Sequence, residues 1–370
     1  MRTMTRLLTL ICLALVALQA PAAEPRAITV ARGLVNPWAL AFLPDGRMLV
    51  TEKPGRLRLV GLDGRLGEPV QGLPPVDDKG QCGLLDVVLD PKFAETRLVY
   101  WTFAEAGEGG NSTAVARGRL ESDARGDRLV DVQTIFRQLP KVSSSAHCGS
   151  RIVFARDGRL FVGLGDRFSR KEDAQTLDNH LGKVVRIEPD GKVPADNPFV
   201  GTAGARPEIW SRGHRNIQGM ALHPASGELW ESEHGPQGGD EVNVVEAGRN
   251  YGWPLVTYGR NYGTGTRIGD EGPRAGFEQP LKWWVPTSIA PSGMAFVTSD
   301  RYAGWKGSLL VGALRGEMLV RLTLNGRNVT GEERLLTRFS ARIRDVRQGP
   351  DGFIYLLTDS NDGRIIRLEP

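Results

Sequence analysis

The chain has little cysteine, little net charge and no apolar run long enough to cross a membrane. Its 370 residues include three cysteines, and one of them, Cys12, lies in an N-terminal apolar run. The histidines lack the close paired spacing of zinc ligands and have no set of cysteines to join them, so no zinc site is predicted. The formal net charge of +4 and the absence of a Lys/Arg run argue against nucleic-acid binding and favour a small-molecule partner.

The N-terminal segment has the order of regions found in a secretory signal peptide. Arg2 and Arg6 precede an apolar run over residues 7–18, which three alanines follow. The run is too short for stable membrane insertion. A lipoprotein signal would place a cysteine after the run, whereas Cys12 lies inside it. We therefore predict a signal peptide over residues 1–23 and a periplasmic or secreted protein.

Short repeats of turns and strands recur along the rest of the chain. Residues 44–60 have the pattern of a turn, a strand, a second turn and a second strand, and residues 350–368 repeat it from the same Pro-Asp-Gly start. Weaker copies begin near residues 91, 157, 225 and 300, so the unit recurs about every 60 residues.

Six units of about four short strands predict an all-β fold, namely a six-bladed β-propeller. A pair of β-sandwiches is the alternative, but it does not require six similarly phased turns. No linker or low-complexity tract interrupts residues 24–370, so we predict one domain there. Loops of successive blades meet at one end of a propeller, where a ligand site is expected.

Polar and glycine-rich segments interrupt the strand pattern. The most unusual group, residues 213–219, 233–243 and 248–254, mixes cationic, amide and acidic side chains with Gly and Pro, as ligand sites often do. Further segments of this kind are residues 80–86, 146–151, 163–167, 312–316 and 342–346. In this combination and order, the segments resemble the soluble sugar dehydrogenases that depend on pyrroloquinoline quinone (PQQ), and in particular the aldose sugar dehydrogenase branch. The resemblance runs from about residue 33 to residue 368.

The resemblance implies how the reaction is catalysed. His147 matches the general base that takes the proton of the anomeric hydroxyl while hydride leaves carbon 1 for the quinone, a role that suits a side chain with a pKa near neutrality. Asp166 matches the carboxylate that orients this histidine and keeps it basic. Without the resemblance, His147 is a structural histidine and Asp166 closes an Asx turn. Gln81 is either a turn amide or, by resemblance, a residue of the cleft near substrate and cofactor.

PQQ carries three carboxylates, so its pocket requires fixed cations, and guanidinium meets a carboxylate in bidentate geometry. By resemblance, Arg215 and Asn216 lie at the reactive quinone carbonyls, where positive charge stabilises developing negative charge. The residues that match those around the cofactor carboxylates are Arg315, Arg342 and Arg344. Arg315 stands where other members of the family carry lysine.

Calcium is the second cofactor that the resemblance implies, because it binds carboxylate and carbonyl oxygens. The main-chain carbonyls of Gly235 and Pro236 match the site that bridges calcium to the cofactor. A second, structural calcium uses the Glu241 carboxylate and the Tyr251 carbonyl, while Asn261 stands where a further carboxylate is expected.

Cys82 and Cys148 each lie beside a motif assigned to the same cleft, so we predict a disulfide between them; two separate buried thiols are the alternative. Trp305 is expected in the core, and Trp283 and Trp284 belong either to the core or to a sugar-stacking platform. The loops are too short for large substrate caps, so we expect an open cleft and broad acceptance of aldoses.

The leading functional hypothesis is therefore a calcium- and PQQ-dependent aldose dehydrogenase that forms lactones and passes electrons to an external acceptor, as a monomer or homodimer. A calcium-dependent lactonase would need several carboxylates converging on the metal, and the arginine set argues against it. A non-enzymatic binding propeller would not explain His147, Asp166 and the arginines together.

Overall fold

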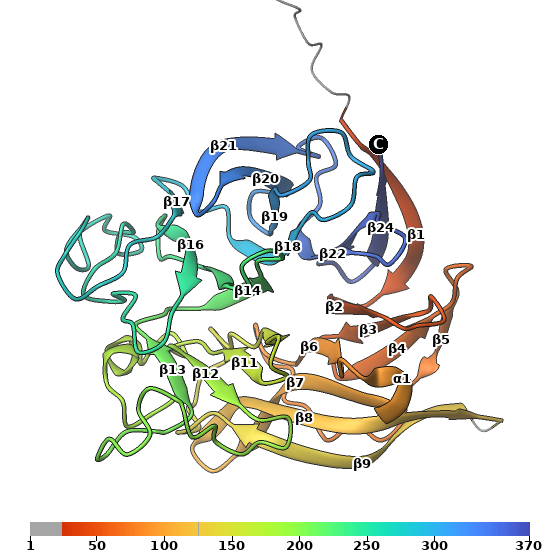
Figure 1. The fold of residues 1–370 in the computed structure, drawn as a ribbon, viewed down its shortest axis with the longest axis horizontal. Coiled ribbons are helices and arrows are strands. Elements are labelled where there is room, and N and C mark those ends of the chain that lie inside the picture. The colour runs from red at the N-terminus through yellow and green to blue at the C-terminus, as the bar shows by residue number, and fades with distance from the viewer. Residues whose placement is uncertain (1–23, 125) are drawn as a thin grey trace, which may run out of the picture.

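The computed structural model of the protein describes residues 24–124 and 126–370. These residues form six antiparallel four-stranded sheets that are arranged radially around a central axis (Figure 1). The predicted six-bladed β-propeller is confirmed. The predicted signal peptide falls outside the described residues and stays a prediction. Within the described ranges, no helix has the length and apolarity that a membrane span requires.

Five of the sheets are built from four strands that follow one another in the chain. The first sheet contains β2 (Pro37–Phe42), β3 (Met48–Glu52), β4 (Arg56–Val60) and β5 (Leu66–Pro69). The second contains β6 (Leu84–Leu89), β7 (Leu98–Gly107), β8 (Gly110–Asp123) and β9 (Gly126–Arg137), with the short helix α1 (Phe93–Thr96) between its first two strands. The third contains β10 (Ile152–Phe154), β11 (Leu160–Gly163), β12 (Lys183–Ile187) and β13 (Ile209–Arg212), with the 3-10 helix η1 (Lys171–Gln175) between β11 and β12. The fourth contains β14 (Ile217–Leu222), β15 (Leu229–Glu233), β16 (Asp240–Val245) and β17 (Lys282–Trp284). The fifth contains β18 (Pro291–Phe296), β19 (Leu309–Ala313), β20 (Met318–Asn325) and β21 (Asn328–Leu335).

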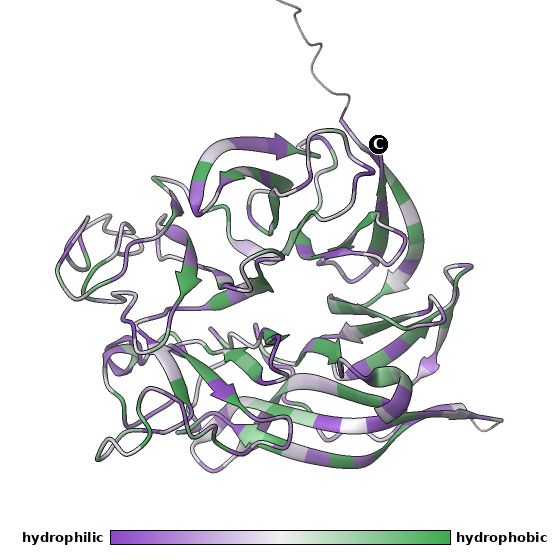
Figure 2. Ribbon diagram, in the orientation of Figure 1, coloured by the Kyte–Doolittle hydropathy of each residue, from purple (hydrophilic) through white to green (hydrophobic). Residues whose placement is uncertain are grey.

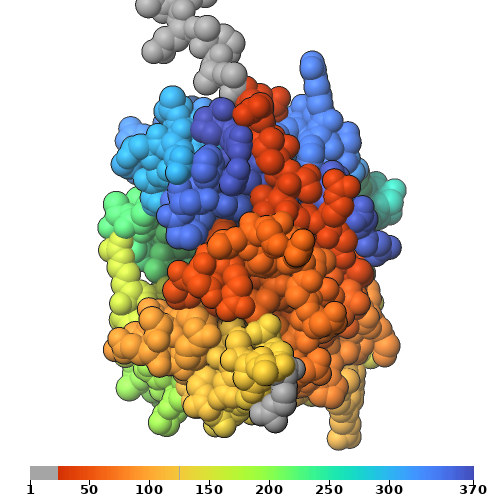
Figure 3. Space-filling model, turned by 90° about the vertical axis from the view of Figure 1, so that its right-hand side faces the viewer, coloured from red at the N-terminus to blue at the C-terminus, as the bar shows by residue number. Residues whose placement is uncertain are grey.

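The sixth sheet joins the two ends of the described chain and closes the ring. Its strands β22 (Ile343–Gln348), β23 (Ile354–Thr358) and β24 (Gly363–Glu369) come from the C-terminus, and its outer strand β1 (Arg26–Leu34) comes from the N-terminal side. Arg26 lies opposite Glu369 in the β1–β24 register. Figure 3 shows the red first strand lying against the blue last strands. Closure leaves no open gap between the first and last blades.

The predicted repeat is the turn between the first and second strands of each sheet. At Asp45, Asp157 and Asp351 the carboxylate accepts a hydrogen bond from the backbone N–H two residues later, at 3.0, 3.0 and 3.1 Å. The glycine that follows each aspartate has a φ of 81° to 88°, which a side chain with a Cβ rarely adopts. The Asp-Gly pair therefore fixes these turns. All six predicted repeats begin in the connection between the first and second strands of a sheet.

The core lies between neighbouring sheets rather than in one central mass. The described residues contain six buried hydrophobic clusters, each drawn from two adjacent sheets. Leu57 of the first sheet packs in one cluster with Trp101 of the second, and Leu357 of the sixth packs in another with Val50 of the first. Figure 2 shows hydrophobic and hydrophilic residues alternating along outer strands such as β8 and β9. Because burial between sheets holds the ring together, the loops at its ends are free to carry the site.

Candidate functional site

Most of the predicted site residues lie in loops at one end of the propeller. Gln81, His147 and Arg215 lie in connections that lead from the last strand of one sheet to the first strand of the next. Asp166 and Gly235 lie in connections between the second and third strands of a sheet. In an antiparallel four-stranded blade, both kinds of connection lie at the end opposite the Asp-Gly turns. The topology thus gathers residues from four successive blades at one mouth of the central channel.

His147 and Asp166 form a close pair at this mouth. The Nδ1 atom of His147 lies 2.6 Å from Oδ1 of Asp166, and both side chains are buried. Asp166 also accepts hydrogen bonds from the Phe168 N–H at 2.8 Å and from the Trp253 indole N–H at 2.8 Å. A carboxylate held in this way fixes the Nδ1–H tautomer of the histidine and leaves Nε2 with its lone pair.

The pKa of His147 is set by opposing effects. Burial, followed by the positive charge of Arg215, lowers the pKa of His147 below its ordinary value, although the hydrogen bond and charge of Asp166 act in the opposite direction. Burial of Asp166 opposes its ionisation, but the hydrogen bond from His147 and the nearby cations outweigh burial and lower the pKa of Asp166. The pair is therefore a neutral imidazole beside a carboxylate near neutral pH, which is the form that a general base requires.

The backbone around this pair adopts an unfavourable conformation. His147, Arg167 and Phe168 have φ values of 50°, 59° and 63°, in the left-handed region that residues other than glycine seldom occupy. A Cβ added at Gly165 would lie 2.0 Å from the carbonyl oxygen of His147, so only glycine fits there. Strain of this kind is concentrated at functional sites.

Gln81 supports the histidine from the neighbouring loop. Its Oε1 accepts a hydrogen bond from the backbone N–H of His147 at 2.8 Å. Beside both residues, the predicted Cys82–Cys148 disulfide is present, with a Cα–Cα distance of 5.7 Å. The buried guanidinium of Arg167 lies against this disulfide, and burial lowers the pKa of Arg167 to about 10. In this structure Gln81 therefore contacts the loop that carries His147.

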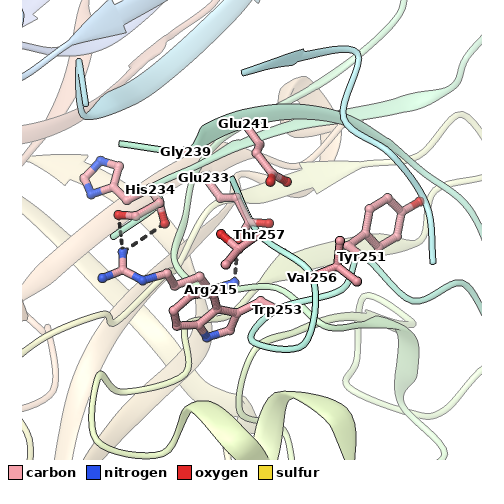
Figure 4. A pocket seen from close by; sticks show the side chains of 10 residues that line it. Arg215, Glu233, His234, Gly239, Glu241, Tyr251, Trp253, Val256 and Thr257 are labelled. Carbon is pink, nitrogen blue, oxygen red and sulfur yellow. Dashed lines mark hydrogen bonds between the residues drawn. The ribbon is translucent and has the colours of Figure 1, made fainter. Parts of the chain in front are cut away.

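Arg215 lies between the histidine and the loop after β15. Its Nη1 donates hydrogen bonds to the carbonyl oxygens of His234 at 2.9 Å and Gly235 at 2.6 Å, which Figure 4 shows as dashed lines. Its guanidinium carbon lies 5.2 Å from the centre of the Trp253 ring. The next residue, Asn216, is buried, and its Oδ1 accepts a hydrogen bond from the Gly149 N–H at 3.2 Å. One of the two carbonyls predicted to bind calcium is thus engaged by Arg215.

An open cavity of about 220 Å³ lies beside His147 and Arg215. Trp253 and Pro236 line it, and the exposed side chains of Phe168 and Tyr262 stand at its rim. The remaining residues that line the cavity are Lys171, Asn261 and Ile268. Aromatic rings and a few polar groups are typical of a cofactor or sugar pocket.

Two of the three predicted carboxylate-binding arginines meet at Asp359. Arg342 Nη2 lies 2.9 Å and Arg344 Nη2 lies 3.2 Å from Asp359 Oδ2, and Arg344 also donates to Gln218 Oε1 at 2.9 Å. Arg342 is largely exposed, whereas burial lowers the pKa of Arg344. Arg315 is exposed just beyond β19. The structure thus brings Arg342 and Arg344 together on one acidic partner.

The residues predicted for the structural calcium belong to a smaller cavity. Glu241 and Tyr251 line it together with Glu233 (Figure 4), which lies directly opposite Glu241 in the β15–β16 register. Burial, and then the charge of Glu233, raise the pKa of Glu241 well above its ordinary value. Asn261 lines the larger cavity instead, where its Nδ2 donates to Arg267 O at 3.0 Å.

The tryptophans have different environments. Trp305 is buried and stacks on Tyr302 with a ring separation of 4.9 Å, as expected of a core residue. Trp284 is also buried, whereas Trp283 is 39% exposed and stacks on Tyr258 at 4.5 Å. The cavity beside His147 is lined by Trp253, which the sequence analysis did not single out although it lies in the 248–254 motif.

Comparisons with known proteins agree over nearly the whole chain. A family model described as Glucose / Sorbosone dehydrogenase matches residues 34–367. The chain is 45% identical to the aldose sugar dehydrogenase YliI of Escherichia coli over 368 residues, which is 98% of each protein. A crystal structure of a glucose dehydrogenase superposes with a TM-score of 0.90 at 49% identity and covers 94% of this chain and 100% of its own. The PQQ-bound form of an aldose sugar dehydrogenase from Streptomyces coelicolor superposes with a TM-score of 0.77 at 31% identity, over 95% of this chain and 99% of its own.

Proposed function

The chain belongs to the glucose/sorbosone dehydrogenase family and is an oxidoreductase, and from this premise we propose that it oxidises aldose sugars at the anomeric carbon to lactones with PQQ and calcium as cofactors. The observation that carries the proposal is the His147–Asp166 pair at 2.6 Å, placed with Arg215 on one cavity of about 220 Å³. The PQQ-bound relative from Streptomyces coelicolor supports the choice of cofactor.

The described residues fit PQQ by charge. The cofactor is a planar quinone with three carboxylates, and the Nε atoms of Arg215 and Arg344 are buried without a hydrogen-bond partner. Arg342, Arg344 and Arg315 would bind the carboxylates, with Asp359 holding the first two in place. Arg215 and Asn216 would lie at the quinone carbonyls. When bound, PQQ supplies the acceptor for the hydride that leaves carbon 1 of the sugar.

The remaining steps belong to residues of this chain. His147 Nε2 takes the proton of the anomeric hydroxyl, because Asp166 holds Nδ1–H and leaves Nε2 as the acceptor. The Asp166 carboxylate then stabilises the imidazolium, while the positive charge of Arg215 stabilises negative charge that develops nearby. The exposed rings of Phe168 and Tyr262 are suited to the apolar faces of a sugar, and the open rim favours several aldoses over one.

Calcium would use the carbonyls of Gly235 and Pro236 at the cofactor, and the Glu241 carboxylate with the Tyr251 carbonyl at the structural site. Gly235 O accepts a hydrogen bond from Arg215 Nη1 at 2.6 Å, so calcium would compete with Arg215 for this carbonyl oxygen. Carbonyl and carboxylate oxygens suit this ion. The reaction would need an external electron acceptor, and we propose that the protein lies in the periplasm or outside the cell.

Reconstitution of the purified protein with PQQ and calcium tests this function. We expect a quinone absorbance that remains with the protein and bleaches when an aldose is added, with a lactone as product. A calcium-dependent lactonase would hydrolyse lactones without PQQ, and a binding propeller would change neither sugar nor quinone. Either result would refute the proposal.

A further inference from the structure

A second group of ionisable side chains lies inside the fourth blade, behind the residues of the proposed reaction. Glu231 and Glu233 are two apart on β15, so their side chains lie on the same face of the sheet. His214, in the loop before β14, covers that face, with Nδ1 3.8 Å from Glu231 Oε1 and 3.6 Å from Glu233 Oε1. All three residues are buried, and one ligand atom from each lies within 4.8 Å of the others.

The charges of this cluster have no cation beside them. Among the ion pairs of residues 24–124 and 126–370, none joins a lysine or arginine to Glu231 or Glu233. The guanidinium of Arg215 donates instead to the carbonyls of His234 and Gly235. Burial of a carboxylate without a counter-charge is costly, and two such groups side by side are more costly still.

Two polar atoms of the cluster also lack hydrogen-bond partners, although their side chains are fully buried. These atoms are His214 Nδ1 and Glu231 Oε2. The other ring nitrogen of His214 lies 2.8 Å from Ser211 Oγ, and the ring stacks on Tyr251, so the orientation of His214 is fixed. A histidine that donates one ring N–H to an oxygen and turns the other nitrogen toward carboxylates has the arrangement of a metal ligand.

We propose that His214, Glu231 and Glu233 bind a divalent transition-type ion, with zinc as the representative. Ligands about 2.1 Å from a tetrahedral zinc lie roughly 3.4 Å from one another. The separations of 3.8 and 3.6 Å from His214 Nδ1 approach that value, so these two contacts would need to shorten by only a few tenths of an ångström. One imidazole with two carboxylates favours such an ion over calcium, which prefers oxygen ligands alone.

The ion would fix the loop that carries the proposed cofactor contacts. Glu233 accepts hydrogen bonds through Oε2 from the backbone N–H groups of Arg215 and Asn216, while its Oε1 faces His214. The predicted structural calcium uses different ligands, Glu241 and the Tyr251 carbonyl. The transition-type ion therefore has a structural role, and its binding can be measured without PQQ or sugar.

Cobalt(II) provides a direct probe, because its visible absorption reports coordination by nitrogen and oxygen. The full-length mature protein, freed of metals with a chelator and then saturated with calcium, is titrated with Co²⁺ and afterwards with Zn²⁺. We expect one Co²⁺ per chain with an absorption band that Zn²⁺ abolishes. Glu231→Gln removes a charge without changing the side-chain volume, and it should weaken Co²⁺ binding by at least about tenfold.

Two further variants serve as controls. Glu208→Gln alters a second, half-buried histidine–glutamate contact, where Glu208 Oε2 lies 3.3 Å from His180 Nε2, and it should leave the Co²⁺ band unchanged. Glu241→Gln should alter the response to calcium but keep the band. The proposal is overturned if the parent protein binds no Co²⁺, if Glu231→Gln binds it as tightly as the parent, or if Glu241→Gln abolishes the band. Titration of the same samples with PQQ tests the proposed function separately.

Discussion

Replacement of Asp166 by asparagine tests how the proposed catalytic histidine, His147, is held. The Asp166 carboxylate accepts hydrogen bonds from His147 Nδ1–H, the Phe168 N–H and the Trp253 indole, at 2.6, 2.8 and 2.8 Å. An amide has one acceptor oxygen, and its NH₂ group donates. If the amide donates to Nδ1, His147 carries its proton on Nε2 and cannot accept the proton of the sugar hydroxyl.

We expect kcat of Asp166→Asn to fall by about 100- to 10,000-fold, the range usually lost with one general base. That range corresponds to roughly 3–5 kcal/mol of transition-state stabilisation. PQQ affinity should change little, because the arginines proposed to bind the cofactor carboxylates lie on other segments of the chain. Stopped-flow reduction of bound PQQ by an aldose measures the chemical step alone.

Trp253→Phe is the matched control for this variant. It removes one hydrogen bond to Asp166 but leaves the carboxylate and its contact with His147 in place. A hydrogen bond to a charged group contributes roughly 1.5–3 kcal/mol, so kcat should fall by at most about ten- to a hundred-fold, less than in Asp166→Asn. If Asp166→Asn reduces bound PQQ within threefold of the parent rate, Asp166 does not set the protonation of His147 and the catalytic assignment is wrong.

Further predictions concern the cofactor contacts, the disulfide and the pH profile. Arg344→Ala should weaken PQQ binding about ten- to a hundred-fold with little loss of kcat at saturation, since a charge-assisted hydrogen bond contributes roughly 1.5–3 kcal/mol. A variant that binds PQQ as tightly as the parent would contradict the assignment of Arg344. Arg215→Ala should lower kcat as well as PQQ affinity. Cys82→Ser should lower the free energy of unfolding by about 2–4 kcal/mol in denaturant titrations, and an unchanged midpoint would argue against a stabilising bridge. Burial and the charge of Arg215 lower the pKa of His147, and the neutral form is the proposed base. The value of kcat/KM should therefore persist as the pH falls below the ordinary pKa of histidine, and decline only at lower pH. A decline that begins above the ordinary pKa would contradict the shift.

The blades could be predicted from the sequence because their turns are local. Asp45-Gly46 and its counterparts encode a hydrogen bond over two residues and a positive φ at glycine, and neither depends on distant parts of the chain. The pairing of His147 with Asp166 was predicted only through the resemblance, since the strands β10 and β11 and the turn between them separate the two residues. The predicted disulfide was correct for a related reason, because both cysteines flank motifs of one cleft.

Other contacts could not be predicted, because the fold creates them across strands. Nothing in the sequence around Arg215 indicates that its guanidinium binds the Gly235 carbonyl. The contact between Glu231 and His214 could not be found by looking for ligands close together in the sequence, because strand β14 and a loop separate the two residues. Period-two spacing of Glu231 and Glu233 on a strand was the one local signal, and it becomes informative only when the neighbouring loop is known.

The most direct test of the account is single-turnover reduction of the PQQ- and calcium-loaded protein by an aldose that carries deuterium on carbon 1. If hydride leaves the anomeric carbon while His147 takes the hydroxyl proton, the bound quinone is reduced, the product is the lactone, and deuterium slows the reduction relative to the unlabelled sugar. If the bound quinone is not reduced by aldoses, or is reduced at the same rate with both sugars when the chemical step limits the rate, oxidation at the anomeric carbon is contradicted.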